Sequence, residues 1–328
     1  MTEPRLITRR DFLVTSALAA AGTTLGLAAA ETAPEPLIDI HQHTDYGGER
    51  DAEWNIIKPG RPNAPLVAHQ RAMGVTKTIL LPAGSRLRRP STHQGRANGL
   101  DSTCSGNEEC YALAKAHPGE FYFGANEVSD LESAPKEIEK YLKLGAVIIG
   151  EQKFGVECDS PEMQKLFQLA AAYNVPIVMH WQVKSYNYGF ERFYKMLEKY
   201  PKTNFIGHAQ TFWANADAGY KDDENNLYPK GKVTPGGRSD RDLSDYPNMF
   251  GDLSAGSGLN ALKRDANGRT FIERHQDKLM FGSDCTDTIG RGGSCSGAMQ
   301  IAQLRALAPS KTVERKLLYE NANKLFRF

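Results

Sequence analysis

An α/β fold, specifically a (β/α)8 TIM barrel with loop insertions on the C-terminal face, is the architecture that this sequence predicts. Eight short apolar runs alternate with segments of helical periodicity over about 290 residues, and such a barrel typically needs roughly 250 residues before insertions. The alternative is an open doubly wound sheet. No Gly-x-Gly-x-x-Gly motif follows the first apolar run, which argues against the dinucleotide-binding version of that sheet.

The apolar runs have the composition of strands buried on both faces, because Val, Ile, Leu, Phe and Met dominate them and Gly, Pro or polar residues bound them. We expect strands at residues 37–43, 76–81, 121–125, 146–152, 175–180, 204–208, 249–253 and 278–284. In a barrel these strands are parallel, so their C-terminal ends meet at one mouth, where the active sites of this fold lie.

Helices are expected between the strands, at residues 64–73, 107–116, 133–144, 160–173, 188–199, 268–275, 297–307 and 310–325. Ser133 and Ser160 are expected N-caps, and Gly74 and Gly145 are expected to end helices. The polar segments 44–62, 83–106 and 211–246 show little apolar periodicity and are expected as loops. The last segment is long enough to form a lid or a subunit contact.

The N-terminus carries an export pattern. Arg9 and Arg10 form a twin-arginine pattern, and the Ala-rich run that follows ends in Ala28-Ala29-Ala30, which suits signal cleavage. The alternative is a transmembrane anchor, but the run is rich in Ala, Gly and Thr and only weakly hydrophobic. We therefore expect residues 1–30 to be a signal peptide read by the twin-arginine export machinery. The mature barrel, residues 31–328, would then be periplasmic or secreted.

The charge balance excludes some partners. The chain has 40 Lys and Arg against 39 Asp and Glu, and residues 1–30 hold three of the former and two of the latter, which leaves 37 of each. A neutral mature protein has no basic face for nucleic acid or anionic membranes, and no second apolar run could span a bilayer. A small molecule is the expected partner, and a homo-oligomer stays open.

The chain has five cysteines, and an oxidising destination permits disulfides between them. Cys104 with Cys110 and Cys285 with Cys295 are the loop pairs that the spacing allows, although spacing does not fix connectivity. Cys285 adjoins a strand end but alternation turns it away from the barrel centre, so we do not expect it to be a nucleophile.

Histidines gather at the ends of the predicted strands. His41 and His43 are two residues apart at the end of the first strand, so they point the same way and form half of a metal site. His180 and His208 end the fifth and sixth strands, and Asp284 ends the eighth. A lone histidine in such a place is usually an ordinary core residue, but an ordered set at one barrel mouth indicates a functional site.

These motifs resemble those of the amidohydrolase superfamily, in the amidohydrolase-related branch that includes aminocarboxymuconate semialdehyde decarboxylase. The matching segments are Ile-Asp-Ile-His41-Gln-His43, Val-Met-His180-Trp, Ile-Gly-His208-Ala, Phe-Gly-Ser-Asp284 and Tyr-Glu-Asn321-Ala-Asn-Lys-Leu-Phe. Each motif alone has low specificity, but the ordered set spans nearly the whole mature chain.

The resemblance implies one divalent metal ion, Zn²⁺ or alternatively Mn²⁺, with His41, His43, His180 and Asp284 as its ligands. It also implies two catalytic residues, Asp284 and His208, of which His208 is an acid, a base or an electrostatic stabiliser. A mixed nitrogen and oxygen ligand set with an open position lowers the pKa of a bound water towards about 7. Asp284 could accept the proton of that water and pass it to the leaving group.

Further candidates surround this set. Glu151 and Lys153 end the fourth strand, where some relatives have a Glu or a carboxylated Lys that bridges two metals. A salt bridge or a substrate contact is the alternative for them, and we favour one metal with either residue close by. Trp181 is either a wall of the substrate pocket or a core aromatic. Arg86, with Arg88 and Arg89, either binds a substrate carboxylate or belongs to a solvated charge run.

The expected function is therefore a metal-dependent hydrolase that uses metal-activated water on a small-molecule carbonyl in a lactone, ester or amide. The resemblance also allows a lyase on the same scaffold, a non-oxidative decarboxylase of a carboxylated ring or a muconate-type substrate. A non-catalytic metal- or ligand-binding barrel is the alternative from another class. The complete set of histidines and aspartate argues against it.

Overall fold

The structure is a computed structural model, and it describes residues 35–50, 56–85, 99–100 and 104–328. The described elements belong to the compact unit Pro36–Phe328. The predicted signal peptide, residues 1–30, and the predicted substrate contact Arg86 lie outside the described residues, so both stay predictions.

Eight parallel strands form the barrel. They are β1 (Leu37–Gln42), β4 (Val75–Leu80), β5 (Phe121–Phe123), β6 (Ile149–Gln152), β7 (Ile177–His180), β8 (Phe205–His208), β9 (Met249–Asp252) and β10 (Leu279–Met280). They form two ladders, β1-β4-β5 and β10-β9-β8-β7-β6. A parallel bridge from Ala125 to Ile149 joins the ladders on one side. The Ile40 N–H donates to the Phe281 carbonyl at 3.1 Å on the other side. The predicted (β/α)8 fold is thus confirmed.

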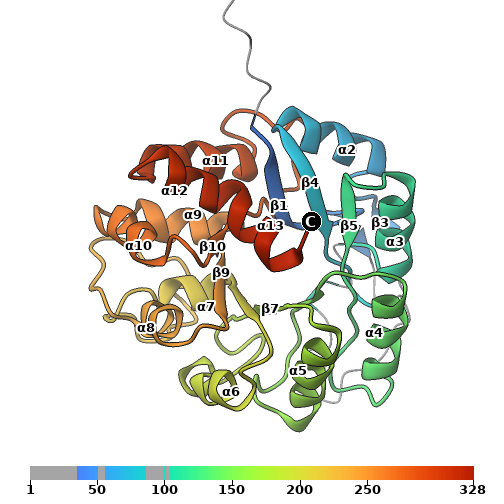
Figure 1. The fold of residues 1–328 in the computed structure, drawn as a ribbon, viewed down its shortest axis with the longest axis horizontal. Coiled ribbons are helices and arrows are strands. Elements are labelled where there is room, and N and C mark those ends of the chain that lie inside the picture. Colours follow the sequence, from blue (N-terminus) through green and yellow to red (C-terminus); the bar gives the residue numbers. More distant parts are fainter. Residues whose placement is uncertain (1–34, 51–55, 86–98, 101–103) are drawn as a thin grey trace, which may run out of the picture. The chain divides into compact units, whose positions relative to one another are not determined.

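Helices surround the strands (Figure 1). In chain order they are α2 (Asn63–Ala72), α3 (Asn107–Ala116), α4 (Ala134–Lys143), α5 (Pro161–Tyr173), η1 (Phe190–Arg192), α6 (Tyr194–Lys199), α7 (Ala209–Ala214), α8 (Arg238–Asp245), α9 (Ala255–Lys263), α10 (Asn267–His275), α11 (Ser296–Leu307), α12 (Lys311–Arg315), η2 (Lys316–Glu320) and α13 (Asn321–Phe326). A short antiparallel pair, β2 (Glu49–Arg50) and β3 (Ile56–Lys58), lies in the first polar loop. No helix of the described residues is long and apolar enough to cross a membrane.

The local signals of the sequence are borne out unevenly. Ser160 caps α5 as predicted, since its side chain accepts from the Met163 N–H, and Gly74 and Gly145 follow α2 and α4 with positive φ. Ser133 was predicted as a cap, but its own backbone is already helical (φ −78°, ψ −10°), so it makes no side-chain cap bond. The segment 211–246, predicted as a loop, holds part of α7 and all of α8. Helix α7 buries Phe212 and Trp213 in the apolar core, whereas α8 buries mainly polar residues such as Asp240, which bonds His275.

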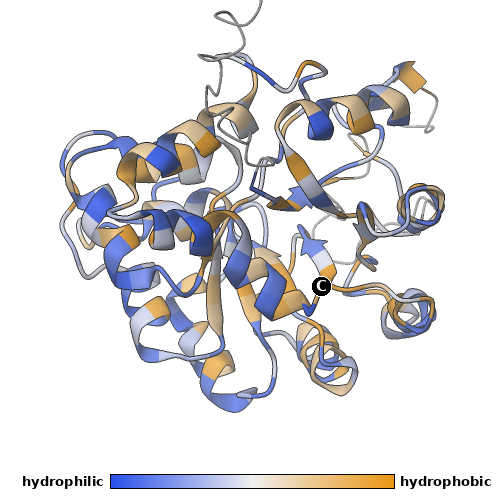
Figure 2. Ribbon diagram, turned by 45° about the horizontal axis from the view of Figure 1, so that its top comes forward, coloured by the Kyte–Doolittle hydropathy of each residue, from blue (hydrophilic) through white to orange (hydrophobic). Residues whose placement is uncertain are grey.

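Two apolar layers hold the barrel together. The inner layer fills the space between the strands with fully buried aliphatic side chains, namely Ile38, Ile40, Ile79, Leu81, Ile148, Val178, Ile206 and Met280. Phe326 of α13 packs against this layer, so α13 covers one end of the barrel. The outer layer lies between strands and helices, and Figure 2 shows apolar segments on the strands and mixed colouring along the helices. Each buried side chain of this size contributes about 1.5–3 kcal/mol.

Candidate metal and active site

Seven polar side chains meet at the C-terminal ends of the strands. They are His41 and His43 from β1, Glu151 from β6, His180 from β7, His208 from β8, Asp252 from β9 and Asp284 beyond β10. Six of them are at most 4 % exposed, and the Asp284 side chain is 12 % exposed. Because the strands are parallel and the barrel is closed, residues distant in sequence share one mouth, as predicted.

The ligand-like atoms of the first strand face two carboxylates. The Nε2 atoms of His41 and His43 are 3.2 Å apart. Each lies 3.4 Å from Oε2 of Glu151, and they lie 3.8 Å and 3.6 Å from Oδ1 of Asp284. Donor atoms at about 2.0–2.2 Å from a zinc ion in a tetrahedral shell are separated by roughly 3.3–3.6 Å. The residues present therefore fit a divalent metal ion by both chemistry and spacing.

His180 lies at the mouth, but its hydrogen bond is to Glu151 and not to the histidines of β1. Its Nδ1 donates to Oε1 of Glu151, while its Nε2 lies 3.4 Å from Oε1 of Gln182. At the mouth, two candidate ligand groups have atoms within 4.8 Å of one another, namely His41 with His43 and Asp284, and His41 with Glu151 and His208. Glu151 thus lies between His180 and the Nε2 atoms of His41 and His43. The ligand role of His180 stays a prediction.

His208 lies beside the same carboxylates. Its Nε2 is 3.4 Å from Oε1 of Glu151 and 3.9 Å from Oδ2 of Asp284. Its Nδ1 lies 3.1 Å from Oδ2 of Asp252 and 3.0 Å from Oγ of Ser254. One ring nitrogen is therefore anchored and the other faces the mouth, which suits the predicted role of His208 in proton handling or charge stabilisation.

Asp284 reaches the mouth by a departure from strand geometry. β10 ends at Met280, earlier than the predicted end at residue 284, and the chain then crosses towards β1, where the Asp284 N–H donates to the His41 carbonyl at 2.9 Å. Asp284 adopts φ +42°, a left-handed conformation that Asp tolerates better than most residues. Its Oδ1 accepts the Tyr46 hydroxyl at 2.6 Å. Cys285 points elsewhere, as expected.

The family model of the amidohydrolases matches residues 38–328. The chain belongs to this amidohydrolase family. This family generally uses a divalent metal ion, in keeping with the donor set at the barrel mouth. No curated protein matches the sequence.

Solved structures similar to this amidohydrolase include both hydrolases and decarboxylases. A probable 2-pyrone-4,6-dicarboxylic acid hydrolase from Acinetobacter baumannii is 14 % identical, with a TM-score of 0.58 over 89 % of this chain and 99 % of the other. A 2,6-dihydroxybenzoate decarboxylase from Rhizobium is 12 % identical, with a TM-score of 0.53 over 89 % and 99 %. The 5-carboxyvanillate decarboxylase from Sphingomonas paucimobilis is 17 % identical, with a TM-score of 0.51 over 80 % and 82 %. At these identities the likeness shows a shared fold.

Burial and opposite charges set the protonation of the amidohydrolase cluster. Burial lowers the pKa of His41, but the attraction of Asp284, Asp252 and Glu151 outweighs it, and the pKa is raised well above its ordinary value. Burial raises the pKa of Asp252, but His41 and other partners hold it far below the usual range. Burial and the charge of Lys153 lower the pKa of His180 to about 4. His180 is thus a neutral donor to anionic Glu151.

Lys153 lies close to the cluster without an ion-pair partner among the described residues. Burial lowers its pKa, but the attraction of Glu151 and Asp284 outweighs burial and raises it, so the ammonium stays charged. Its Nζ lies 5.7 Å from the centre of the Tyr186 ring. The predicted roles of Lys153 as a substrate contact or a metal-bridging residue stay predictions.

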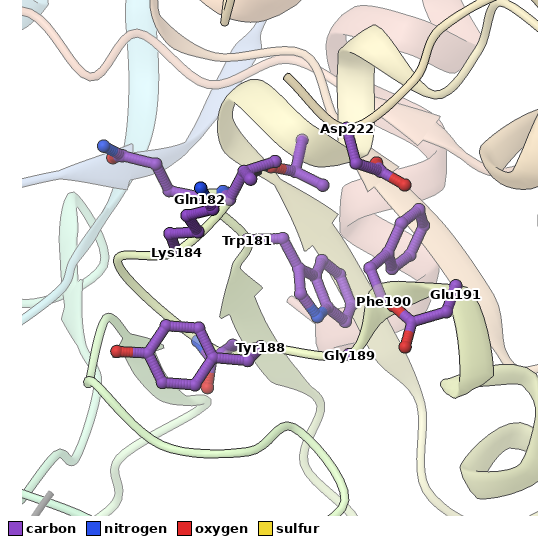
Figure 3. Close-up of a pocket in the computed structure, with 11 residues that line it drawn as sticks. Trp181, Gln182, Lys184, Tyr188, Gly189, Phe190, Glu191 and Asp222 are labelled. Atoms are coloured by element: carbon purple, nitrogen blue, oxygen red, sulfur yellow. Dashed lines mark hydrogen bonds between the residues drawn. The ribbon is translucent and has the colours of Figure 1, made fainter. Parts of the chain in front are cut away.

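A cavity of about 460 Å³ lies beside the cluster (Figure 3). Trp181, Gln182, Tyr188 and Phe190 are among its lining residues, and none of the seven cluster residues lines it. Gln182 connects the two, because its Oε1 lies 3.4 Å from Nε2 of His180. Trp181 faces this cavity and is also fully buried in the outer apolar layer. Both predicted interpretations of Trp181 therefore have support.

Sequence reasoning missed two residues of the amidohydrolase site. Asp252 is fully buried, and its Oδ2 accepts from Nδ1 of His41 at 2.6 Å. Its position at the end of a predicted strand was the same signal that identified Asp284. Tyr46 bonds Asp284 from the polar loop after β1, where no periodicity or motif marks a single position.

Proposed function

We propose that this amidohydrolase is a metal-dependent hydrolase of small carboxylated molecules, acting on the carbonyl of a lactone, ester or amide. The observation that carries the proposal is the convergence of His41, His43, Glu151 and Asp284 at ligand spacing, with His208 adjacent. A simple ligand-binding barrel would not require anionic carboxylates and histidines to converge in this way, because burying them together costs free energy.

His41, His43 and Asp284 would hold the ion, with Glu151 and His180 completing or supporting the ligand set. Zn²⁺ suits this set, and Mn²⁺ is the alternative. When bound, the ion supplies Lewis-acid polarisation and lowers the pKa of a water towards about 7. A water can bind the ion only where the protein leaves one ligand position open.

Asp284 is the residue that we expect to move the proton. Its Oδ1 faces the histidines of β1 while its Oδ2 faces His208, so one carboxylate contacts both sides of the mouth. During hydrolysis the water oxygen bonds to the carbonyl carbon and its proton passes to Asp284. The bond to the leaving group then breaks, and the proton moves from Asp284 to the departing oxygen or nitrogen. His208 stabilises the developing negative charge on the carbonyl oxygen.

The carboxylated substrate class rests on Lys153. A charged lysine near the cluster, with no carboxylate partner among the described residues, is a suitable point for binding a substrate anion. The names of the similar solved structures agree with this class, since they include a dicarboxylic acid hydrolase and a carboxyvanillate decarboxylase. Arg86, which follows β4 in the sequence, is a second candidate for the same task.

Non-oxidative decarboxylation is the second candidate function, and the similar structures favour it as much as hydrolysis. In that reaction the bond between the ring carbon and the carboxylate breaks, carbon dioxide leaves, and a protonated group at the mouth returns a proton to the carbon. Asp284 or His208 would hold that proton. The same residues therefore serve both candidates, and the product distinguishes them.

One experiment separates the two candidate reactions. Purified holoenzyme is incubated with a panel of lactones, esters and carboxylated aromatics in water labelled with heavy oxygen, and products are followed by mass spectrometry. Hydrolysis incorporates the label into the new carboxylate, whereas decarboxylation releases carbon dioxide and leaves the product unlabelled. A His41→Ala/His43→Ala variant should lose the activity, and a His117→Ala variant on the surface should keep it. Metal binding without turnover on any substrate class would favour the non-catalytic barrel.

We also propose that residues 1–30 direct export of the folded protein by the twin-arginine route. The support is the sequence pattern around Arg9 and Arg10. Cell fractionation of the wild type and of an Arg9→Lys/Arg10→Lys variant tests this proposal. Accumulation of the variant inside the cell supports it, and equal export of both proteins contradicts it.

A further inference from the structure

A second cluster of metal-ligating side chains lies away from the barrel mouth. It consists of His69 from α2, Cys285 and Asp287 from the loop after Asp284, and Cys295 at the N-cap of α11. One ligand atom from each of the four lies within 4.8 Å of the others. None of these side chains takes part in the proposed reaction, and they come from three separate segments of the chain.

The cluster is a buried site. His69 and Cys295 are fully buried, Cys285 is 3 % exposed, and the Asp287 side chain is 12 % exposed. Sγ of Cys285 lies 3.5 Å from Sγ of Cys295, which lies 3.3 Å from Nε2 of His69. The same Nε2 lies 3.8 Å from Oδ2 of Asp287.

These separations match a tetrahedral metal shell. With bonds of about 2.3 Å to sulfur and about 2.0–2.2 Å to nitrogen or oxygen, tetrahedral geometry places donor atoms roughly 3.3–3.8 Å apart. The three distances given above lie in that range. Two thiolates with an imidazole and a carboxylate are a donor set for zinc, because hard cations such as Mg²⁺ and Ca²⁺ prefer all-oxygen sites.

We propose that His69, Cys285, Asp287 and Cys295 form a second, structural zinc site. Four protein ligands leave no open position for water, which is the mark of a structural site. The site would join α2, α11 and the loop that follows Asp284.

Neighbouring groups prepare this second site. The Ala298 N–H donates to Sγ of Cys295 at 3.3 Å. Oδ2 of Asp287 accepts the N–H groups of Ile289 and Gly290 at 3.0 Å and 2.7 Å, which fixes the carboxylate in place. Such bonds orient ligands and tune their affinity for the metal.

Arg61 supplies a compensating charge. Its Nη1 donates to the Asp287 carbonyl at 2.6 Å, and the side chain is largely buried. Two thiolates and a carboxylate carry three negative charges against two positive charges on zinc, so a nearby guanidinium makes the buried group neutral. Burial of an uncompensated charge would be costly.

The second site is coupled to the barrel mouth through the backbone. Cys285 directly follows Asp284, and the Cys285 carbonyl accepts from Nε2 of Gln42 at 3.2 Å. Gln42 lies between His41 and His43, and its Oε1 accepts from Arg61 at 2.6 Å. A zinc ion at the second site would therefore fix the loop that positions Asp284.

A disulfide between Cys285 and Cys295 is the competing use of these sulfurs. None of the five cysteines forms a disulfide in the structure. A disulfide would also leave His69 and Asp287 converging on the sulfurs without a chemical reason. The zinc proposal uses all four groups.

Cobalt substitution tests the proposal on the intact protein. Wild-type protein is stripped of metal under reducing conditions and titrated with Co²⁺, and its absorption is recorded in the near ultraviolet. A thiolate ligand gives a charge-transfer band there, whereas the histidine and carboxylate set of the barrel mouth does not. We expect the band in the wild type and equally in the His41→Ala/His43→Ala variant, so this test is independent of the proposed function.

Variants assign the band to the named residues. Cys295→Ser should remove the band and lower the zinc content by about one equivalent per chain. Cys158→Ser, at a buried cysteine away from the cluster, should change neither. If Cys295→Ser fails to fold, Asp287→Asn keeps both sulfurs and should weaken Co²⁺ binding by about 10-fold or more. Absence of the band in folded wild type, or a Cys285–Cys295 disulfide in protein purified from its native compartment without reductant, would overturn the proposal.

Discussion

Asp252 sets the proton positions of two histidines at the barrel mouth. Its Oδ2 lies 2.6 Å from Nδ1 of His41 and 3.1 Å from Nδ1 of His208, so both rings donate from Nδ1 and turn Nε2 towards the barrel mouth. Ser254 adds a third donor to the same oxygen at 2.8 Å. A carboxylate behind a ligating histidine fixes its tautomer and raises its basicity.

We predict that Asp252→Asn weakens metal binding at the mouth by about 10–100-fold. An amide of nearly the same size carries no negative charge and therefore holds the His41 N–H more weakly, so His41 loses its orientation. Competition with a coloured chelator measures the affinity. Asp277→Asn, at a side chain that is 72 % exposed, is the control and should leave it unchanged. Unaltered affinity in Asp252→Asn would contradict this role.

Tyr46 orients the side chain of Asp284 by a hydrogen bond. Its hydroxyl donates to Oδ1 of Asp284 at 2.6 Å, and its ring lies against that of His43, with centroids 4.6 Å apart. Burial, together with the charge of Asp284, raises the pKa of Tyr46 well above its ordinary value, so the hydroxyl remains a donor. It therefore holds one oxygen of the carboxylate towards the β1 histidines.

We expect Tyr46→Phe to lower kcat/KM by about 10-fold or more while the fold stays intact. A hydrogen bond to a charged group is worth about 1.5–3 kcal/mol. Steady-state kinetics on the substrate found in the labelling experiment measure the effect, with Tyr194→Phe at an exposed position as the control. Equal kcat/KM in both variants would show that Asp284 needs no support from Tyr46.

The sequence predicted the eight strands of this barrel, but it did not predict where the last strand, β10, ends. Strand composition predicted all eight strands, because residues buried on both faces must be apolar. The final strand was expected to run through Asp284, yet the ladder ends at Met280, where the chain turns to close against β1. Closure is a long-range contact, so no local pattern reports it.

Helix α8 was also missed by local sequence patterns. It carries a buried carboxyl group. Asp242 is 7 % exposed. Burial, with a smaller contribution from Asp245, raises its pKa from 3.8 to about 7 against the opposing charges of Arg241 and Arg238. The folded protein therefore retains a proton that the unfolded chain loses above its ordinary pKa. Stability falls as the pH rises from about 4 to about 7.

We predict that Asp242→Asn stabilises the protein above neutral pH. The amide is never charged, so the variant avoids the cost of ionising a buried carboxyl. The expected gain is about 1–2 kcal/mol near pH 8 and close to zero near pH 4. Thermal unfolding across this range measures it, and a gain that is independent of pH would be inconsistent with the proposed cause.

Asn321 bonds helix α13 to the barrel, in addition to the apolar packing of Phe326. Nδ2 of Asn321 donates to the carbonyls of Gln276 and Leu279 at 2.7 Å and 2.8 Å. We expect Asn321→Ala to lower the free energy of unfolding by about 2–3 kcal/mol, because two carbonyls lose their donor. Urea unfolding measures the change. Lys324→Ala, exposed on the same helix, should stay within about 0.5 kcal/mol of wild type.

For the whole molecule, barrel closure explains why much of the site could be predicted from sequence. His41, His43, His180, His208 and Asp284 were placed at strand ends, and parallel strands in a closed barrel bring such ends together. Which side chains lie nearest to the Nε2 atoms of His41 and His43 could not be predicted. Glu151, predicted as a bridging or neighbouring residue, is the carboxylate nearest to the Nε2 atoms of His41 and His43, while His180 contacts Glu151. Side-chain reach and the register irregularity between Asp39 and Gln42 decide this arrangement, and neither has a sequence signal.

The central claim is that a metal ion binds at the mouth between β1 and Asp284. An anomalous difference map from crystals of the purified holoenzyme, measured at the zinc absorption edge, tests it most directly. We predict a peak within about 2.0–2.3 Å of Nε2 of His41, Nε2 of His43 and a carboxylate oxygen of Asp284 or Glu151. No peak there, in crystals grown with zinc or manganese at saturating concentration, would contradict the metal-dependent mechanism.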